Sequence, residues 1–273
     1  MLSLSYIFHS CFLLKAEGCC SVIFDFWKCS ADEQRSRYDI QELPAFLDMI
    51  PTGIPLYVVV SHHHKDHFNP SIFRWREARE NIHYVLSNDT ARFARHYLKK
   101  LPDDSYTVLR NGEEFSDGSF RIKAFPSTDI GNSYVVSLSL PGMGRTFDIL
   151  HAGDLNAWLW LDESTEAEIR KMQGDYMAAL RDIASDFPKL DIAMFPVDSR
   201  LGRGYWSGAY ELVRKIDVDR FFPMHFSLGE NIDERKKREV DARRFDLYAN
   251  KEYGEYIALQ SPGDVWAGLP VSR

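Results

Sequence analysis

The sequence contains few cysteines, and their placement argues against a disulfide framework. Four cysteines occur in 273 residues, all within the first 29 positions and without a Cys-x-x-Cys pair: Cys11, Cys19, Cys20 and Cys29. Disulfide scaffolds need partners spaced along the chain, which this sequence lacks. Cys19 and Cys20 are adjacent in a predicted strand, so we expect one of them to face the core as a small hydrophobic residue.

Long apolar runs, repeats and low-complexity tracts are also absent. The longest apolar stretch is far shorter than a membrane span, so no membrane association is expected. No Pro/Gly/Ser-rich linker divides the chain and 45% of its residues are hydrophobic, which predicts a single domain over residues 1–273. The segment from Met1 to His9 has no basic leader and no cleavage site of small residues, so we expect a cytoplasmic protein.

Basic residues form no continuous stripe. The net charge is −7, from 33 Lys and Arg against 40 Asp and Glu, whereas a phosphate backbone normally requires a basic surface. The one basic run, residues 235–238, is flanked by Glu234 and Glu239 and is typical of a solvated helix face. We therefore expect a small-molecule substrate and no nucleic-acid partner, and the sequence leaves homo-oligomerisation open.

The most distinctive feature that is present is the run Ser61-His62-His63-His64-Lys65-Asp66-His67. It follows residues 56–60, whose apolar and β-branched composition predicts a buried strand. Ligand sites of α/β proteins collect at such strand ends. Imidazole and carboxylate groups bind zinc, iron and manganese, and the spacing HxHxDH lets alternate residues reach neighbouring ions. An exposed histidine-rich loop or an affinity tag would not explain an Asp-His pair behind a buried strand.

The rest of the chain reads as strands interrupted by helices. Apolar runs at residues 4–15 and 20–27 predict an antiparallel hairpin. A capping box of Thr165 and Glu168 begins a long amphipathic helix, and helical composition also marks residues 70–80, 89–100 and 233–249. Short strands are expected at residues 82–86, 120–125, 134–140, 146–150, 190–195, 220–222 and 256–259. This order predicts an α/β or α+β protein with two packed sheets and outer helices.

Two of these strands also end in groups that bind metals. Asp154 follows Ala152-Gly153, and the glycine allows close backbone approach. His225 follows the apolar segment 221–224. Alone, Asp154 would be read as a turn or capping residue, and His225 could equally be a core histidine. Their joint occurrence after the HxHxDH run favours metal ligands.

The ordered motifs HxHxDH, Ala-Gly-Asp and Pro-Met-His resemble those of the metallo-β-lactamase superfamily, and they cover most of the chain. The segments His9–Leu14 and Val22–Asp25 resemble the opening hairpin of its L-ascorbate-6-phosphate lactonase-like branch. The resemblance implies an αββα sandwich of two mixed β-sheets flanked by helices, with metals at the edge between the sheets. It also implies a set of ligands: His62 and His64 in a first metal position, Asp66, His67 and His225 in a second, and Asp154 as a bridge.

One element departs from the family pattern. The family normally supplies a third histidine to the first position from the segment that matches residues 125–129, and this segment contains none. Thr128 or Asp129 is nearest to that place. Asp129 would be a harder oxygen ligand and would favour iron or manganese over zinc; otherwise the first position is weak or empty. Zinc is the expected cofactor, with one or two ions, and manganese or iron is the alternative.

These observations predict a metal-dependent hydrolase that uses a metal-bound hydroxide on a small, anionic substrate such as a lactone or phosphoester. Asp66 is the expected catalytic residue, since in the family it orients or deprotonates the water. Two alternatives stay open. One is a degenerate member that binds metal or ligand without turnover, which the missing histidine would permit. The other is a phosphodiesterase that acts on nucleotides or lipid head groups.

Substrate contacts are expected from two loops beside the ligands. In the segment 198–208, Arg200 and Arg203 could hold an anionic group, and Tyr205 or Trp206 could form an apolar wall. The segment 156–160, with two tryptophans, could form another wall. Ordinary loop packing is the alternative for both segments.

The remaining histidines have simpler expected roles. His151 is expected to pack near the site without binding metal, and His83 and His96 to be structural or exposed. His9 has two interpretations: the family resemblance places it near the site, while a strand histidine bonded to backbone is the alternative.

Overall fold

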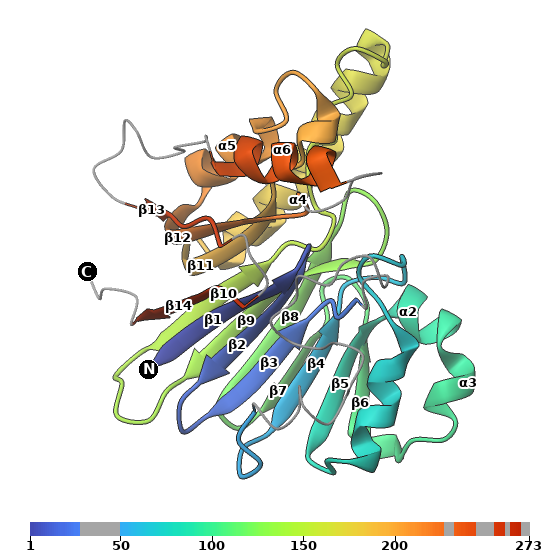
Figure 1. The fold of residues 1–273 in the computed structure, drawn as a ribbon, viewed down its shortest axis with the longest axis vertical. Helices are drawn as coiled ribbons and strands as arrows, with labels where there is room; N and C mark the ends of the chain where they lie inside the picture. The colour runs from blue at the N-terminus through green and yellow to red at the C-terminus, as the bar shows by residue number, and fades with distance from the viewer. Residues whose placement is uncertain (28–49, 227–231, 244–253, 260–262, 269–273) are drawn as a thin grey trace.

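The computed structural model describes residues 1–27, 50–226, 232–243, 254–259 and 263–268. Two seven-stranded sheets pack against each other with helices outside, as Figure 1 shows. The first sheet has the order β14 (Val265–Gly268), β1 (Leu2–Phe8), β2 (Cys11–Ala16), β3 (Cys20–Phe24), β4 (Leu56–Val60), β5 (Ile82–Ser87) and β6 (Tyr106–Leu109). The second has the order β13 (Glu255–Tyr256), β12 (Asp217–Met224), β11 (Lys189–Pro196), β10 (Thr146–His151), β9 (Asn132–Ser139), β8 (Phe120–Pro126) and β7 (Glu114–Asp117).

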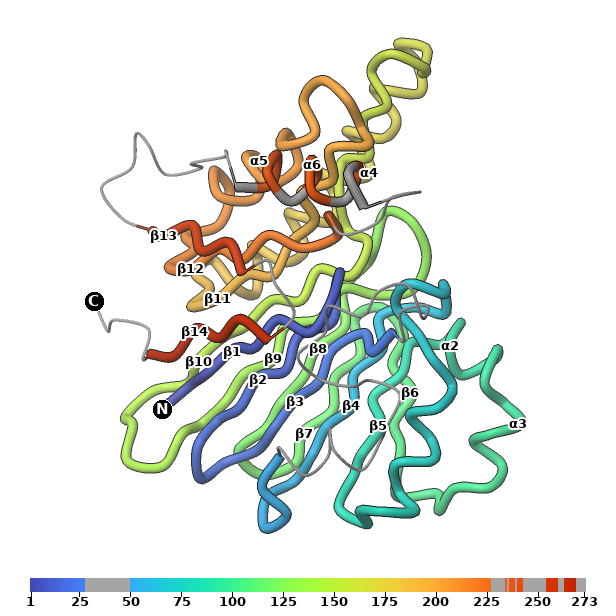
Figure 2. The backbone as a smooth tube through the Cα atoms, in the orientation of Figure 1, coloured from blue at the N-terminus to red at the C-terminus, as the bar shows by residue number. Residues whose placement is uncertain are grey.

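Both sheets are mixed. Strands β1 to β3 pair antiparallel and β3 to β6 pair parallel, while β7 to β10 pair antiparallel and β10 to β13 pair parallel. The backbone trace in Figure 2 shows β14 next to β1, with which it pairs antiparallel. This arrangement confirms the predicted αββα sandwich of two mixed sheets.

The helices cover the outer faces of the sheets. The 3-10 helix η1 (Pro70–Glu77) and the helices α2 (Asn88–Phe93) and α3 (Arg95–Leu98) lie against the first sheet. Helices α4 (Glu166–Asp186) and α5 (Ser207–Lys215) lie against the second. The described elements also include α6 (Ile232–Arg243) and the short 3-10 helices η2 (Asp103–Ser105) and η3 (Ser199–Leu201).

Strand β4 is apolar throughout because it is buried on both faces. Tyr57 and Val59 belong to the core between the sheets, whereas Val58 and Val60 belong to the core beneath η1 and α2. The Tyr57 ring stacks on Phe120 of the other sheet with ring centroids 3.7 Å apart. Adjacent residues of a strand point to opposite faces, so an unbroken apolar run is what a central strand requires.

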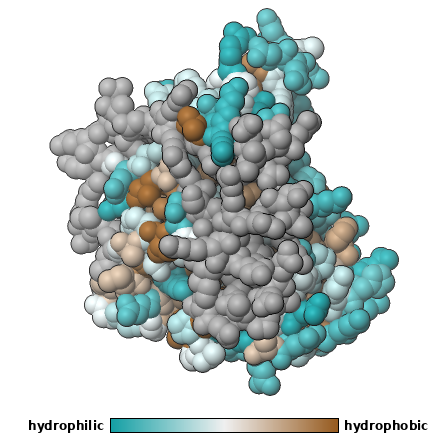
Figure 3. Space-filling view, viewed as in Figure 1, coloured by the Kyte–Doolittle hydropathy of each residue, from teal (hydrophilic) through white to brown (hydrophobic). Residues whose placement is uncertain are grey.

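Helix α4 forms as predicted. Thr165 and Glu168 make both hydrogen bonds of a capping box, which satisfies two backbone donors at the helix start. Tyr176, Leu180 and Ile183 are buried on one face. None of the helices in the described part of the chain is both long enough and apolar enough to span a lipid bilayer. The space-filling view in Figure 3 shows hydrophobic colour only in small separate areas of the described surface on that face.

Several predicted boundaries are wrong. The run at residues 4–15 is two strands, because the chain turns at His9 and Ser10, where His9 has φ +57°. Residues 89–100 form two short helices rather than one, and residues 70–80 form a 3-10 helix. Strands β6, β7 and β14 and helix α5 were not predicted; each has nine residues or fewer and gives little periodic signal. Cys29 and residues 244–249 of the predicted late helix lie outside the described residues.

Candidate metal centre

Four connections meet at one edge between the two sheets. Strand β4 ends at Val60 and leads into the histidine run, strand β10 ends at His151 and leads to Asp154, and strand β12 ends at Met224 and leads to His225. The turn between β1 and β2 brings His9 to the same place. The strand ends singled out in the sequence therefore meet at one place, where the metal site is predicted.

Two glycines allow the segments from the two sheets to approach closely. Gly131 and Gly153 have φ values of +74° and +54°, in the left-handed region that other residues rarely adopt. A Cβ atom at Gly153 would lie 2.7 Å from the Cβ of Ser61, and one at Gly131 would clash with the Ser61 carbonyl oxygen. The Asn132 amide also donates to that carbonyl at 3.0 Å. These contacts fix the start of the histidine run against the second sheet.

The carboxylate of Asp154 lies between two groups of imidazoles. Its Oδ2 is 3.3 Å from His62 Nε2, and its Oδ1 is 3.0 Å from His67 Nε2 and 3.3 Å from His225 Nε2. The side chain is 8% exposed. Each carboxylate oxygen thus faces a different set of nitrogen atoms, which is the arrangement of a carboxylate that bridges two neighbouring cations.

The buried imidazoles are held through their other ring nitrogen. His67 Nδ1 is 2.7 Å from Asp25 Oδ2, and His225 Nδ1 is 2.9 Å from Asp198 Oδ2. His62 Nδ1 is 2.9 Å from the Ser61 hydroxyl, which itself donates to Asp25. A partner of this kind fixes the tautomer and the ring orientation of metal-binding histidines and leaves Nε2 for the metal.

The inward-facing atoms of this cluster have no hydrogen-bond partners among the described residues. They are His62 Nε2, His67 Nε2, His225 Nε2 and Asp154 Oδ1, all buried; their contacts of 3.0 to 3.3 Å lack hydrogen-bond geometry. Buried polar atoms are normally satisfied. Imidazole nitrogens and carboxylate oxygens that converge without partners fit a divalent cation, so the residues present match the metal that the fold implies.

Ligand-type atoms of the described residues form three groups, and within each group the atoms lie within 4.8 Å of one another. The groups are His9, Asp66, His67 and His225; His62, His64, Asp129 and Asp154; and Asp25, His62 and His67. The first two groups separate His62 and His64 from Asp66, His67 and His225, as the predicted ligand sets do. Metal binding itself stays a prediction.

Of Thr128 and Asp129, the two residues predicted nearest to the missing third histidine, Asp129 is the one that faces a predicted ligand. The Thr128 hydroxyl donates to the Asn156 carbonyl at 2.6 Å, so it braces the loop that carries the tryptophans. Asp129 Oδ2 instead lies 3.5 Å from His64 Nδ1. Both side chains are nearly half exposed, at 45% for His64 and 47% for Asp129. The first metal position is therefore more open to solvent than the second, whose ligands His67 and His225 are buried.

The carboxylates of the cluster remain ionised at neutral pH. Burial opposes the charge of Asp66, but contact with His9 and the positive charge of neighbouring imidazoles hold its pKa far below the usual range. Burial likewise opposes ionisation of Asp154, and His67 and His225 outweigh it and lower its pKa. Burial opposes the charge of His67, yet Asp154 and Asp25 raise its pKa. Ionised carboxylates are the form that binds metals.

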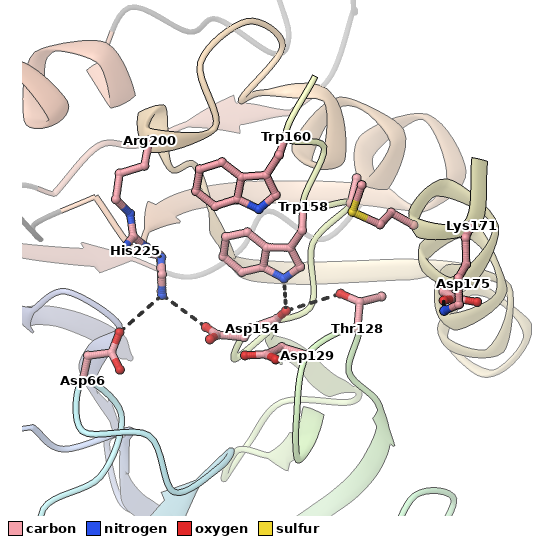
Figure 4. Close-up of a pocket in the computed structure, with 12 residues that line it drawn as sticks. Asp66, Thr128, Asp129, Asp154, Trp158, Trp160, Lys171, Asp175, Arg200 and His225 are labelled. Atoms are coloured by element: carbon pink, nitrogen blue, oxygen red, sulfur yellow. Dashed lines mark hydrogen bonds and ion pairs between the residues drawn. The ribbon is translucent and has the colours of Figure 1, made fainter. Parts of the chain in front are cut away.

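A cavity of about 430 Å³ opens above this cluster. Figure 4 shows Trp158 and Trp160 along one side, Arg200 near His225, and the pair Lys171 and Asp175 at the far end. The Trp158 indole donates to the Asp154 carbonyl at 2.8 Å, which fixes this wall relative to the metal ligands. A cavity of this size fits a small molecule.

The structure brings Arg200 to the cavity but not the other three predicted substrate contacts. Arg203 pairs with Asp162 at the surface, where its side chain is 80% exposed. Tyr205 donates its hydroxyl to the Asp241 carbonyl of α6, and Trp206 lines a separate cavity between α4 and α5. The predicted positions of Arg203, Tyr205 and Trp206 were wrong because the chain enters α5 at Ser207 and turns these side chains towards neighbouring helices.

Sequence reasoning did not assign roles to Asp25, Asp198 and Ser61. Asp25 follows β3 directly and Asp198 follows β11 within two residues, so the strand-end rule could have identified both as site residues. His151 lies beside the site without facing its centre, as expected. Its Nε2 contacts the Ser10 carbonyl at 2.8 Å and its ring stacks on Phe24. His83 contacts the Thr107 hydroxyl.

The two-sheet fold and the cluster at its edge are those of the metallo-β-lactamase class. A family model described as a beta-lactamase superfamily domain matches residues 3–225, and the chain belongs to this superfamily. None of the curated proteins matches its sequence.

Solved structures share the fold at low sequence identity. The metallo-beta-lactamase fold protein YhfI from Bacillus subtilis is 14% identical with a TM-score of 0.57, over 98% of this chain and 99% of that chain. A provisionally assigned metal-dependent hydrolase from Parabacteroides distasonis is 16% identical with a TM-score of 0.56, over 96% and 94%. A variant of the β-hydroxylase CmlA is 14% identical with a TM-score of 0.63, over 97% of this chain and 53% of that chain.

Proposed function

We propose that this protein is a metal-dependent hydrolase that acts on a small anionic molecule bound in the cavity above Asp154. The observation that carries the proposal is the position of Asp154, whose two oxygens face two different sets of imidazoles. A binding protein needs only one closed metal site, whereas a shared carboxylate beside an open cavity is the arrangement of a catalytic pair.

The chain supplies ligands for two cations. His62, His64 and Asp129 would hold the first, Asp66, His67 and His225 the second, and Asp154 both. A dication held there lowers the pKa of a coordinated water from 15.7 towards about 7 and polarises the bond under attack. We propose zinc for the second position. At the first position, manganese or iron is the alternative, because Asp129 would supply an oxygen where the family has a third imidazole.

Asp66 is the group that we expect to orient the water. Its side chain is 24% exposed and lines the cavity, in contrast to the fully buried His67. Because its pKa is far below the usual range, it accepts hydrogen bonds at neutral pH and is a weak base. Its role is therefore to position the water and one metal rather than to store a proton. Trp158 and Trp160 restrict the access of bulk water from one side.

Arg200 is the group that we expect to bind the substrate's anionic part. Its guanidinium is held against Asp198 through Nε at 2.7 Å and through Nη2, and Nη2 also lies 3.3 Å from His225 Nδ1. No hydrogen bond within the described chain involves Nη1, which can donate to a carboxylate or phosphate. A phosphorylated or carboxylated lactone, or a phosphoester, would meet these requirements, in keeping with the resemblance to the lactonase-like branch.

The fold alone does not fix the reaction, since the β-hydroxylase CmlA has a similar one. The test is turnover by protein reconstituted with Zn²⁺, Mn²⁺ or Fe²⁺ on panels of lactones and phosphoesters. We expect Asp154→Asn to abolish activity and lower metal content. A protein that holds one ion tightly and turns over none of the substrates would instead be a metal-binding or ligand-binding protein.

Arg200→Ala should raise KM at least about 10-fold, since a charged hydrogen bond contributes about 1.5–3 kcal/mol. Metal content should stay unchanged. Arg203→Ala is the matched control, because it removes an equal charge that pairs with Asp162 outside the cavity. Equal effects of the two substitutions would contradict anion binding by Arg200.

A further inference from the structure

We infer that the imidazole of His9 is an additional ligand of the second metal position, so that three imidazoles and Asp66 surround this ion together with Asp154. The inference rests on the metal centre proposed above. It extends that centre to the β1–β2 turn, which contributes no residue to the ligand set predicted from the sequence.

The backbone of His9 is fixed relative to another ligand. Its amide donates to the Tyr6 hydroxyl at 2.7 Å, and its carbonyl accepts from the His225 amide at 3.3 Å. Both histidines have left-handed backbones, with φ +57° at His9 and +64° at His225. Such conformations cost about 1–3 kcal/mol at residues other than glycine and concentrate at functional sites. The strained turn places the ring centroids of His9 and His225 4.2 Å apart.

The distances suit a common ion. His9 Nε2 lies 3.4 Å from Asp66 Oδ2, which is 3.8 Å from His67 Nε2 and 3.7 Å from His225 Nε2. Ligand atoms about 2.0–2.1 Å from one ion are separated from their nearest neighbours by about 3 Å. The distances to Asp66 Oδ2 are close to this value and all four ligand atoms lie within 4.8 Å of one another, so side-chain movements would bring them to one ion.

Among the described residues, the His9 imidazole has Asp66, itself a predicted ligand, as its ion-pair partner. The His9 side chain is 0% exposed, and neither ring nitrogen makes a hydrogen bond with the described residues. His151, which is equally buried, contacts Ser10 through Nε2 and Gly153 through Nδ1. A buried imidazole with two unsatisfied nitrogens is costly unless a ligand meets one of them.

This assignment makes the two metal positions chemically different. The second would have three nitrogen ligands, and the first would have His62 and His64 with two carboxylates. Nitrogen-rich sites favour zinc and oxygen-rich sites favour manganese. At the first position the chain has the carboxylate of Asp129 in the segment where the family has its third imidazole. At the second position, on the other side of Asp154, it has the additional imidazole of His9. We therefore expect the second position to bind more tightly and to retain zinc when the first is emptied.

The direct test is NMR of ¹⁵N-histidine-labelled protein loaded with ¹¹³Cd²⁺, in which every coordinated nitrogen is split by one-bond coupling to the metal. With both positions filled we expect five split imidazole signals, from His9, His62, His64, His67 and His225. Four split signals, with that of His9 unsplit, would overturn the inference and leave the metal centre intact. No split signals at all would overturn the proposed centre itself.

His9→Asn provides an independent measurement, because asparagine tolerates a left-handed backbone and is too short to reach the ion. Loss of a ligand should weaken the second ion more than the 10–100-fold typical of a residue that only orients a ligand. His83→Asn is the matched control, since His83 is a partly buried histidine of β5 outside the site. An affinity for Zn²⁺ in His9→Asn equal to that of His83→Asn would contradict the inference.

Discussion

Replacing Gly153 by alanine tests how the two sheets are brought together at the metal centre. Gly153 has φ +54°, and an added Cβ would lie 2.7 Å from Ser61 Cβ and 2.9 Å from Ser61 Oγ. The left-handed backbone costs about 1–2 kcal/mol for a residue with a Cβ, and overpacking costs about 1–3 kcal/mol. The expected loss in the free energy of unfolding is therefore about 2–5 kcal/mol.

Gly118→Ala separates these two contributions. Gly118 has nearly the same backbone, with φ +60°, but nothing lies within 4 Å of an added Cβ. Its substitution should cost only the backbone part, about 1–2 kcal/mol, and leave metal affinity unchanged. Gly153→Ala should also weaken metal binding, because Ser61 holds His62 and contacts Asp25.

The measurement is urea unfolding in excess chelator, so that bound metal does not contribute to stability, followed by metal titration of the folded variants. The free energies should be compared at equal m values. The reasoning would be refuted if Gly153→Ala lost no more stability than Gly118→Ala, or if it lost stability and kept the metal affinity of the unmodified protein.

Three further predictions concern the same molecule. Asp129→Ala should remove only the more weakly bound ion, measured by chelator titration followed by metal analysis. Loss of both ions, or of neither, would contradict a ligand role for Asp129. Asp198→Asn should weaken the second ion about 10–100-fold without emptying the first; Asp162→Asn, which alters an exposed ion pair, should change neither affinity. Cys19 should be alkylated at a rate that rises through pH 6 as its thiol ionises, because contact with the Cys20 thiol lowers its pKa to about 6. Cys20→Ala should move that midpoint upwards, and an unchanged midpoint would show that Cys20 is not the cause.

The fold and the centre of the site could be predicted from the sequence because both rest on strand ends. His62, Asp154 and His225 each follow an apolar strand, and parallel neighbours in a sheet bring such ends to one edge. The apolar strand patterns and the metal-binding residue types that follow them sufficed for this step. The orientation of individual loop side chains was not needed, because the direction of each strand already leads these residues to the edge between the two sheets.

The parts that could not be predicted depend on how short loops turn. The apolar alternation of residues 4–15 continues across His9, so the sequence does not show that a left-handed residue divides it into two strands. Arg200 and Arg203 are the same residue type in the same short segment, so the sequence does not distinguish their roles. The 3-10 turn at residues 199–201 directs Arg200 towards His225, whereas Arg203 reaches the surface. Such differences come from tertiary packing, which local patterns do not encode.

The candidate ligand residues are far apart along the chain, and this affects when the protein could acquire metals. His9 and His225 contact each other through their backbones although more than two hundred residues separate them. A chain that has been synthesised only as far as the histidine run holds a few adjacent donors and no bridging carboxylate, so it would bind cations loosely and without selectivity. Tight and selective loading therefore has to follow the pairing of β12 with β11, which makes metal capture one of the last events in maturation.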